Sequence, residues 1–121
     1  TDFIPNAERD WLYQHAEAYV FPSLMEGFGL PGLEAMAYGT PVISSNATCL
    51  PEIYGDAAAY FNPESIDDMA DAIGRVIRDK SLQKSLVQKG YTQVKKYSWE
   101  KMAHETLAVY ENALKNSSEQ S

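Results

Sequence analysis

Short, continuously apolar runs alternate with stretches of helical periodicity along the first half of the chain. The apolar runs have strand length and lie at residues 18–21, 41–44 and 57–61. Helical spacing of apolar residues precedes the first run at 7–16 and follows it at 31–38, and a brief helical turn is predicted at 50–54. Strands without polar alternation that are separated by helices are typical of parallel sheets covered on both faces. The pattern therefore predicts an α/β fold.

The second half of the chain has only helical periodicity. One helix is predicted to begin after Ser65, where Ser65 and Asp68 have the spacing of a capping box, and a second covers 82–97. A third begins after Ser98 and carries an apolar stripe from Trp99 to Leu114, for which core packing is the default expectation. Residues 116–121 are polar and are predicted to form a disordered tail after a domain at 1–115. Doubly wound sheets usually have five or six strands, so three strands indicate part of a larger domain.

Composition and charge exclude several classes of protein. The 121 residues have a formal net charge of −7, which disfavours binding to nucleic acid. A single cysteine, Cys49, excludes an internal disulfide framework and a four-cysteine metal site. No apolar run reaches the roughly 18 residues of a membrane span. The N-terminus does not resemble a signal peptide, and a start at Thr1 suggests that the chain begins inside a longer gene product.

A glycine-rich loop between the first strand and the next helix has the features of an anion site. The loop contains Gly27 and Gly29, and Pro31 is expected in the first turn of the helix, with Gly39 as its left-handed cap. Free amides at a helix N-terminus attract phosphates and other anions. The sequence predicts that such amides point outward at four positions, namely Gly29, Leu30, Gly32 and Leu33.

Two carboxylates, Glu26 and Glu34, flank this loop. A carboxylate accepts two hydrogen bonds from a vicinal diol, which is how acidic residues commonly hold a ribose. Glu34 is placed for that role, although a lone Glu in a first helical turn is most often a surface residue that stabilises the helix dipole. No Lys or Arg lies between Arg9 and Arg75, so a bound diphosphate would depend on backbone amides or on cations outside this interval.

The combination resembles the Glu-x7-Glu signature of retaining glycosyltransferases with the GT-B fold, most closely glycosyltransferase family 4 (group 1). The resemblance extends from residue 3 to 113 and includes Tyr13 to Ser23, Glu34 to Ile43 and Leu50 to Ala58. It implies a Rossmann-like parallel sheet with flanking helices, the C-terminal part of a GT-B donor-binding domain. It also implies that part of the Trp99–Leu114 stripe faces a partner domain, the N-terminal acceptor domain, which is missing here.

The resemblance assigns a role to each residue of the signature. Glu34 would bind the ribose hydroxyls, and Glu26 would lie by the donor sugar as the catalytic carboxylate. The backbone of Gly27, Phe28, Gly29 and Leu30 would contact the sugar hydroxyls and the diphosphate. The implied donor is a GDP- or UDP-linked hexose, transferred with retention to a glycan or lipid-linked acceptor without a metal or other cofactor. A cytoplasmic location is expected, at the inner face of the membrane for the parent protein.

Two other interpretations remain open from the sequence. The family's activating Arg and Lys lie upstream of the matched region, so the chain alone is predicted to be inactive. A non-catalytic module that binds a nucleotide or packs against a partner protein is therefore the main alternative. A flavodoxin-like receiver or flavin domain is less favoured, because the chain lacks clustered acidic residues at an early strand end and its glycine loop comes late.

Overall fold

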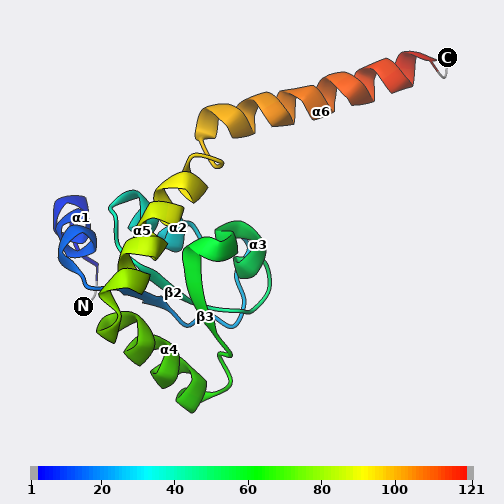
Figure 1. The fold of residues 1–121 in the computed structure, drawn as a ribbon. Coiled ribbons are helices and arrows are strands. Elements are labelled where there is room, and N and C mark those ends of the chain that lie inside the picture. Colours follow the sequence, from blue (N-terminus) through cyan, green and yellow to red (C-terminus); the bar gives the residue numbers. More distant parts are fainter. Residues whose placement is uncertain (1–2, 120–121) are drawn as a thin grey trace.

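The computed structural model describes residues 3–119, which form a parallel sheet with helices on both faces (Figure 1). The strands lie side by side in chain order, as β1 (Tyr19–Phe21), β2 (Val42–Ser45) and β3 (Ala58–Phe61). Val20 is opposite Ile43, and Ile43 is opposite Ala59. The predicted α/β fold class is confirmed.

The helices connect and extend the strands. Four of them lie before or between the strands: α1 (Asn6–His15), α2 (Leu30–Ala37), α3 (Leu50–Tyr54) and the short 3₁₀ turn η1 (Gly55–Ala57). Three follow the last strand: α4 (Ile66–Arg78), α5 (Lys80–Val94) and α6 (Trp99–Glu119). No helix among residues 3–119 is both long enough and apolar enough to cross a membrane.

Two apolar clusters occupy the two faces of the sheet, because side chains of successive strand residues point to opposite sides. Val42 and Ala58 join a cluster with residues of α2 and α3, in which Met36 and Tyr54 are fully buried. The neighbouring strand residues form the other cluster together with residues of α4 and α5. Its members are Ile43, Ala59, Phe61, Ala72, Val76 and Leu86. The sheet is therefore the middle of three layers.

The helix ends follow local sequence signals in most cases. The Ser65 hydroxyl accepts a hydrogen bond from the Asp68 amide at 3.2 Å, which confirms the predicted cap of α4. Gly39 has a φ of 75° just after α2, as the left-handed cap requires. Helix α1 begins one residue before the predicted range of 7–16: Pro5 occupies the cap position, and Asn6 is the first helical residue.

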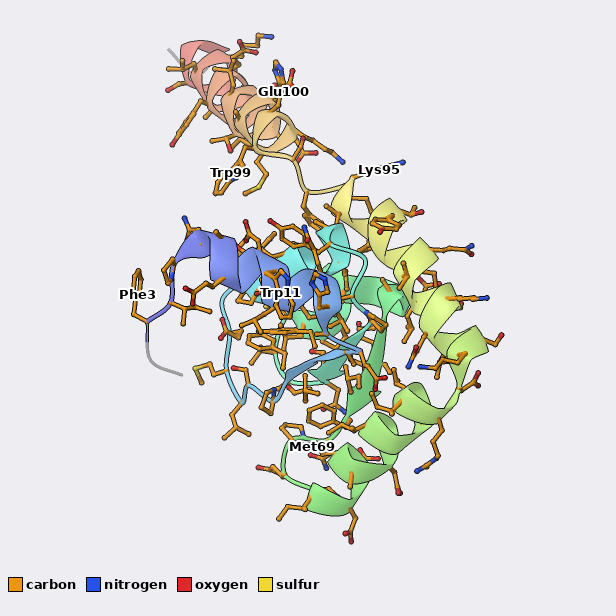
Figure 2. All side chains as sticks on the ribbon, turned by 90° about the vertical axis from the view of Figure 1, so that its left-hand side faces the viewer. Phe3, Trp11, Met69, Lys95, Trp99 and Glu100 are labelled. Carbon is orange, nitrogen blue, oxygen red and sulfur yellow. The ribbon has the colours of Figure 1, made fainter. Side chains whose placement is uncertain are left out.

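Helix α6 projects away from the three layers (Figure 1). Residues 95–98 lead from α5 away from the sheet. Among residues 3–119, the apolar stripe from Trp99 to Leu114 therefore has no layer to pack against. Trp99 is 76% exposed and Tyr110 is 65% exposed, so the default expectation of core packing is wrong (Figure 2). The helix also continues to Glu119, past residue 115, where a disordered tail is expected. No Gly or Pro interrupts residues 99–119, so the helical hydrogen bonds can continue. Residues 120–121 lie outside the described residues.

Candidate functional site

Two loops meet at the carboxyl edge of the sheet, where open α/β sheets bind ligands. The loop of residues 22–29 follows β1, and the loop of residues 46–49 follows β2. Thr48 joins them, because its Oγ1 accepts from the Glu26 amide at 3.4 Å and donates to the Glu26 carbonyl at 3.3 Å. The Cys49 thiol donates to the same carbonyl at 3.3 Å.

Glu26 is therefore held mainly through its backbone. Its side chain accepts one bond, from the Ser23 hydroxyl to Oε1 at 3.4 Å. The Ser23 carbonyl in turn accepts from the Ser45 hydroxyl at 2.6 Å. Thr48 has a φ of 52°, an uncommon conformation for a β-branched residue. Such strain is retained where the surrounding structure enforces it.

Tyr54 lies under the glycine loop and determines its shape. The fully buried Tyr54 hydroxyl donates to the Gly29 carbonyl at 2.6 Å, and burial raises the Tyr54 pKa. A Cβ added to Gly29 would lie 2.6 Å from the Tyr54 Oη, and one added to Gly32 would overlap the same phenol. Gly29 also has a φ of 86°, which few other residues adopt. Packing and backbone geometry thus account for both glycines.

Gly27 differs from these two glycines. A Cβ added there would meet no atom within 4 Å, and Gly27 has no left-handed φ. Neither packing nor backbone geometry within residues 3–119 requires glycine at this position. Among the described residues, the amides of Gly27, Phe28, Gly29 and Leu30 have no hydrogen-bond acceptor. These donors lie together immediately before and at the start of α2.

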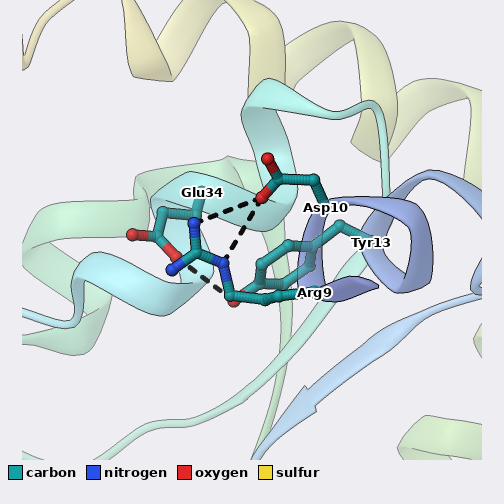
Figure 3. Close-up of polar contacts among 4 residues, drawn as sticks. All are labelled: Arg9, Asp10, Tyr13 and Glu34. Atoms are coloured by element: carbon teal, nitrogen blue, oxygen red, sulfur yellow. Dashed lines mark hydrogen bonds and ion pairs between the residues drawn. The ribbon is translucent and has the colours of Figure 1, made fainter. Parts of the chain in front are cut away.

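Glu34 lies one turn into α2, on the side that faces α1 (Figure 3). Its side chain is exposed, and its Oε2 accepts a hydrogen bond from the Tyr13 hydroxyl at 3.4 Å. Arg9 is close, but its guanidinium bonds Asp10 at 3.2 Å. That bond is the largest cause of a raised Arg9 pKa, and the negative charge of Glu34 makes a smaller contribution.

The two glutamates act on a common neighbour, Tyr19 of β1. Burial is the largest cause of its raised pKa, and the negative charges of Glu34 and then Glu26 add to it. Both carboxylates therefore lie near the same strand. That the two glutamates flank one binding site stays a prediction.

One prediction for this region is wrong, and two further residues have contacts of their own. The Gly32 amide donates to the Gly29 carbonyl at 3.2 Å, so the prediction of a free, outward amide there is wrong. The side chain of Phe28 packs edge-on against Tyr97, with ring centroids 5.5 Å apart. His15 is exposed and stacks on Trp11 at 4.1 Å.

Sequence reasoning missed the residues that support the two glutamates and the glycine loop. Tyr13, Thr48 and Tyr54 each bond a loop or helix residue more than 20 positions away. Periodicity reports local structure and gives no partner at that separation. One signal was available: polar hydroxyls within apolar stretches, as in Tyr54, need a hydrogen-bond partner when buried.

Fold and site together define the class: an α/β domain whose described residues present a loop of backbone amides without acceptors at the carboxyl edge of a parallel sheet. The model of the family "Glycosyl transferases group 1" matches residues 1–93. The chain belongs to the group 1 glycosyltransferases.

Relatives of known function agree with this family. The chain is 39% identical to O-antigen chain mannosyltransferase B of Escherichia coli, over 89% of the chain and 28% of that protein. It is 37% identical to the serotype-specific mannosyltransferase WbdA of Escherichia coli, over 98% of the chain and 15% of that protein. The chain thus spans less than a third of these relatives.

Solved structures agree as well. The C-terminal domain of a group 1 family protein (LpcC) from Francisella tularensis matches with a TM-score of 0.69 and 35% identity, over 79% of the chain and 51% of that chain. Sucrose-phosphate synthase from Thermosynechococcus elongatus matches with a TM-score of 0.77 and 30% identity, over 88% of the chain and 28% of that one. The three strands and their helices match the C-terminal domain of GT-B proteins.

Proposed function

We propose that this chain is the donor-binding part of a retaining glycosyltransferase, which transfers a hexose from a nucleoside-diphosphate sugar to a glycan or lipid-linked acceptor. The observation that carries the proposal is the group of four amides, Gly27 to Leu30, that have no acceptor among residues 3–119 and lie at the start of α2. Amides at the positive end of a helix bind phosphate oxygens or hydroxyls. The names of the relatives favour mannose as the sugar.

Each part of the site has a role in this proposal. The exposed Glu34 carboxylate accepts hydrogen bonds from the two ribose hydroxyls. The amides of the loop hold the diphosphate and the sugar hydroxyls. Glu26, nearer the strand end, contacts the transferred sugar and supports its anomeric centre. Gly27 supports this arrangement, because the open space beside it is what a close ligand would need.

Cations are part of the whole enzyme in this proposal and come from outside the interval from Arg9 to Arg75. Stabilising the charge on the leaving diphosphate is usually the largest catalytic contribution in such a transfer. We therefore propose that the 121-residue chain alone binds donor nucleotides but does not transfer sugar. In this proposal the transfer uses no metal or cofactor, and the parent protein carries it out in the cytoplasm.

Calorimetric titration with GDP, UDP, GDP-mannose and UDP-glucose tests the donor site. We expect Kd in the micromolar to millimolar range, and Glu34→Gln to weaken nucleoside diphosphates by about tenfold, the loss of roughly one charged hydrogen bond. Glu52→Gln is the matched control, because Glu52 is also an exposed helical glutamate but belongs to α3. Equal effects of the two variants would reject the role of Glu34.

Glu26 is tested by comparing a nucleotide with its sugar conjugate. Glu26→Gln should weaken GDP-mannose by about threefold to tenfold while leaving GDP within twofold, since Glu26 contacts only the sugar in this proposal. Equal loss of both ligands would contradict that assignment. Sugar transfer by the purified chain would contradict the proposed inactivity.

A non-catalytic module that packs against a partner is the second candidate function. The apolar face of α6 favours it, since Trp99, Leu107 and Tyr110 are each more than half exposed. Absence of binding for every nucleotide above would support this candidate over the first.

A further inference from the structure

The carboxylate of Glu34 has one hydrogen-bond donor among residues 3–119, the hydroxyl of Tyr13. The bond to Oε2 is 3.4 Å long and joins α1 to α2 across 21 positions of sequence (Figure 3). Glu34 is exposed, and an exposed glutamate normally samples several rotamers, which must be given up when it binds a ligand. A donor that already engages one oxygen reduces that loss.

Tyr13 is itself fixed by its neighbours. Its ring stacks on Tyr38 with centroids 5.7 Å apart and an interplanar angle of 9°, and it tilts against Tyr19 at 5.6 Å. Its backbone carbonyl accepts a hydrogen bond from the Thr40 hydroxyl. Tyr13 is thus held by the turn after α2 and by β1, and its direction toward Glu34 does not depend on a ligand.

The chemistry of the donor also suits the role. A phenol bonds to a carboxylate without neutralising it, whereas a lysine or arginine would compete for its charge. Burial, with smaller contributions from Tyr19 and Glu34, raises the Tyr13 pKa to about 12. Tyr13 therefore remains a neutral donor at physiological pH, and Oε1 stays available to a diol.

We propose that Tyr13 is a positioning residue that holds the Glu34 carboxylate in the orientation that accepts both hydroxyls of a ribose. The inference rests on the proposed function, in which Glu34 binds the nucleoside. It adds a specificity-determining contact from α1: Tyr13 increases discrimination between ribose and sugars that lack the vicinal diol. It also explains why the exposed α1, which has no fully buried residue, is anchored to α2 at this point.

The test compares GDP with 2′,3′-dideoxy-GDP, in the complete 121-residue chain and its variants. Tyr13→Phe keeps the ring stack and removes only the hydroxyl. We expect it to weaken GDP by about fivefold to tenfold, the value of one hydrogen bond to a charged group, and to change dideoxy-GDP by less than twofold. Tyr19→Phe is the control, because Tyr19 belongs to the same aromatic group and has no bond to Glu34.

A double-mutant comparison separates positioning from general loss of structure. In the Glu34→Gln background, Tyr13→Phe should cause no further loss of GDP affinity, whatever its effect on melting temperature. A loss of GDP and dideoxy-GDP in equal proportion, or a full additional loss in the double variant, would overturn the proposal.

Failure of the proposed function gives a different result. If the unaltered chain binds no GDP, or binds GDP and dideoxy-GDP equally, Glu34 does not bind the diol and the role of Tyr13 falls with it. Suppose instead that the unaltered chain prefers GDP to dideoxy-GDP, that Glu34→Gln abolishes this preference and that Tyr13→Phe preserves it. Only the inference about Tyr13 is then wrong.

Discussion

Glu26 and Glu34 lie eight positions apart but are supported by different means. Glu34 stands on α2, whose neighbouring residues Ala35 and Met36 are fully buried, and its side chain is bonded by Tyr13. Glu26 lies in a loop beside Met25, which is 82% exposed, and hydroxyl and thiol groups of the next loop hold its backbone. Helix packing therefore fixes the position of Glu34, and a few polar contacts fix that of Glu26.

The difference has a consequence for ligand recognition in the proposed site. A carboxylate on a packed helix is pre-oriented and suits a part of the ligand that is the same in every donor, the ribose. A carboxylate in a loop held by four long hydrogen bonds can shift with the group beside it, the sugar. Substitutions should separate the two parts of the ligand accordingly.

The largest effect is expected where packing supports the glycine loop. Gly32→Ala places a methyl group on the Tyr54 phenol and should destabilise the chain by about 1–3 kcal/mol or more, as overpacking does. Gly27→Ala meets no atom and should change the free energy of unfolding by less than about 0.5 kcal/mol. Urea unfolding of the two variants measures both. Equal destabilisation would show that Gly27 also has a structural role.

High pH should ionise the tyrosines that support the site and leave the hydroxyl groups that support Glu26 unchanged. Burial is the main cause that raises the pKa of Tyr13 and of Tyr60 to about 12, from an ordinary value near 10, and it also raises the pKa of Tyr54. Because these folded-state values are raised, the stability they contribute is complete below pH 10 and is lost as pH rises toward 12. Absorbance at 295 nm, followed with circular dichroism, should show part of the phenols ionising only as the chain unfolds. Ionisation of all eight tyrosines near pH 10 in a folded chain would contradict this.

Thr48 tests the polar support of Glu26. Thr48→Ala removes both bonds to the Glu26 backbone and also relieves a β-branched residue at a φ of 52°. We expect GDP-mannose to bind about threefold more weakly, with GDP unchanged, from the loss of two long hydrogen bonds. Thr48→Ser keeps the hydroxyl and is the control. A loss of GDP affinity would mean that the loop of residues 46–49 also supports the nucleotide part of the site.

Arg9 should have the smallest effect. It is close to Glu34, yet its partly exposed side chain bonds Asp10, and solvent-accessible ion pairs of this kind contribute little. Arg9→Gln should change GDP affinity by less than about twofold, because the proposed orientation of Glu34 depends on a phenol. Lys89→Gln is the comparison, because the Lys89 side chain is about as exposed as that of Arg9 and pairs with Asp56. A loss as large as that of Tyr13→Phe would assign the support of Glu34 to the cation.

The sequence predicted the features that depend on neighbours along the chain. The three parallel strands, the start of α2 near Pro31, the cap at Gly39 and the Ser65 cap each follow from a few adjacent residues. The same reasoning placed Glu26 and Glu34 on either side of one loop at a strand end. Local signals were enough for these features because secondary structure and turns are set mainly by short-range interactions.

Features that depend on distant partners could not be predicted in this way. The inward amide of Gly32 results from the tight first turn of α2, above the phenol of Tyr54, which is 22 positions away. The exposed stripe of α6 has the same apolar periodicity as a buried helix, and periodicity does not say whether a partner is present. The Tyr13–Glu34 bond likewise exists only because α1 and α2 meet in space.

The most direct test of the account is the response of backbone amides to GDP in ¹H–¹⁵N correlation spectra of the 121-residue chain. The account predicts that the largest shifts belong to Gly27, Phe28, Gly29 and Leu30, whose amides have no acceptor within the described chain. Gly39 and Gly55, which are left-handed glycines outside the loop, serve as internal controls and should move little. Shifts concentrated on α6, or an unchanged loop at saturating GDP, would contradict the proposed donor site.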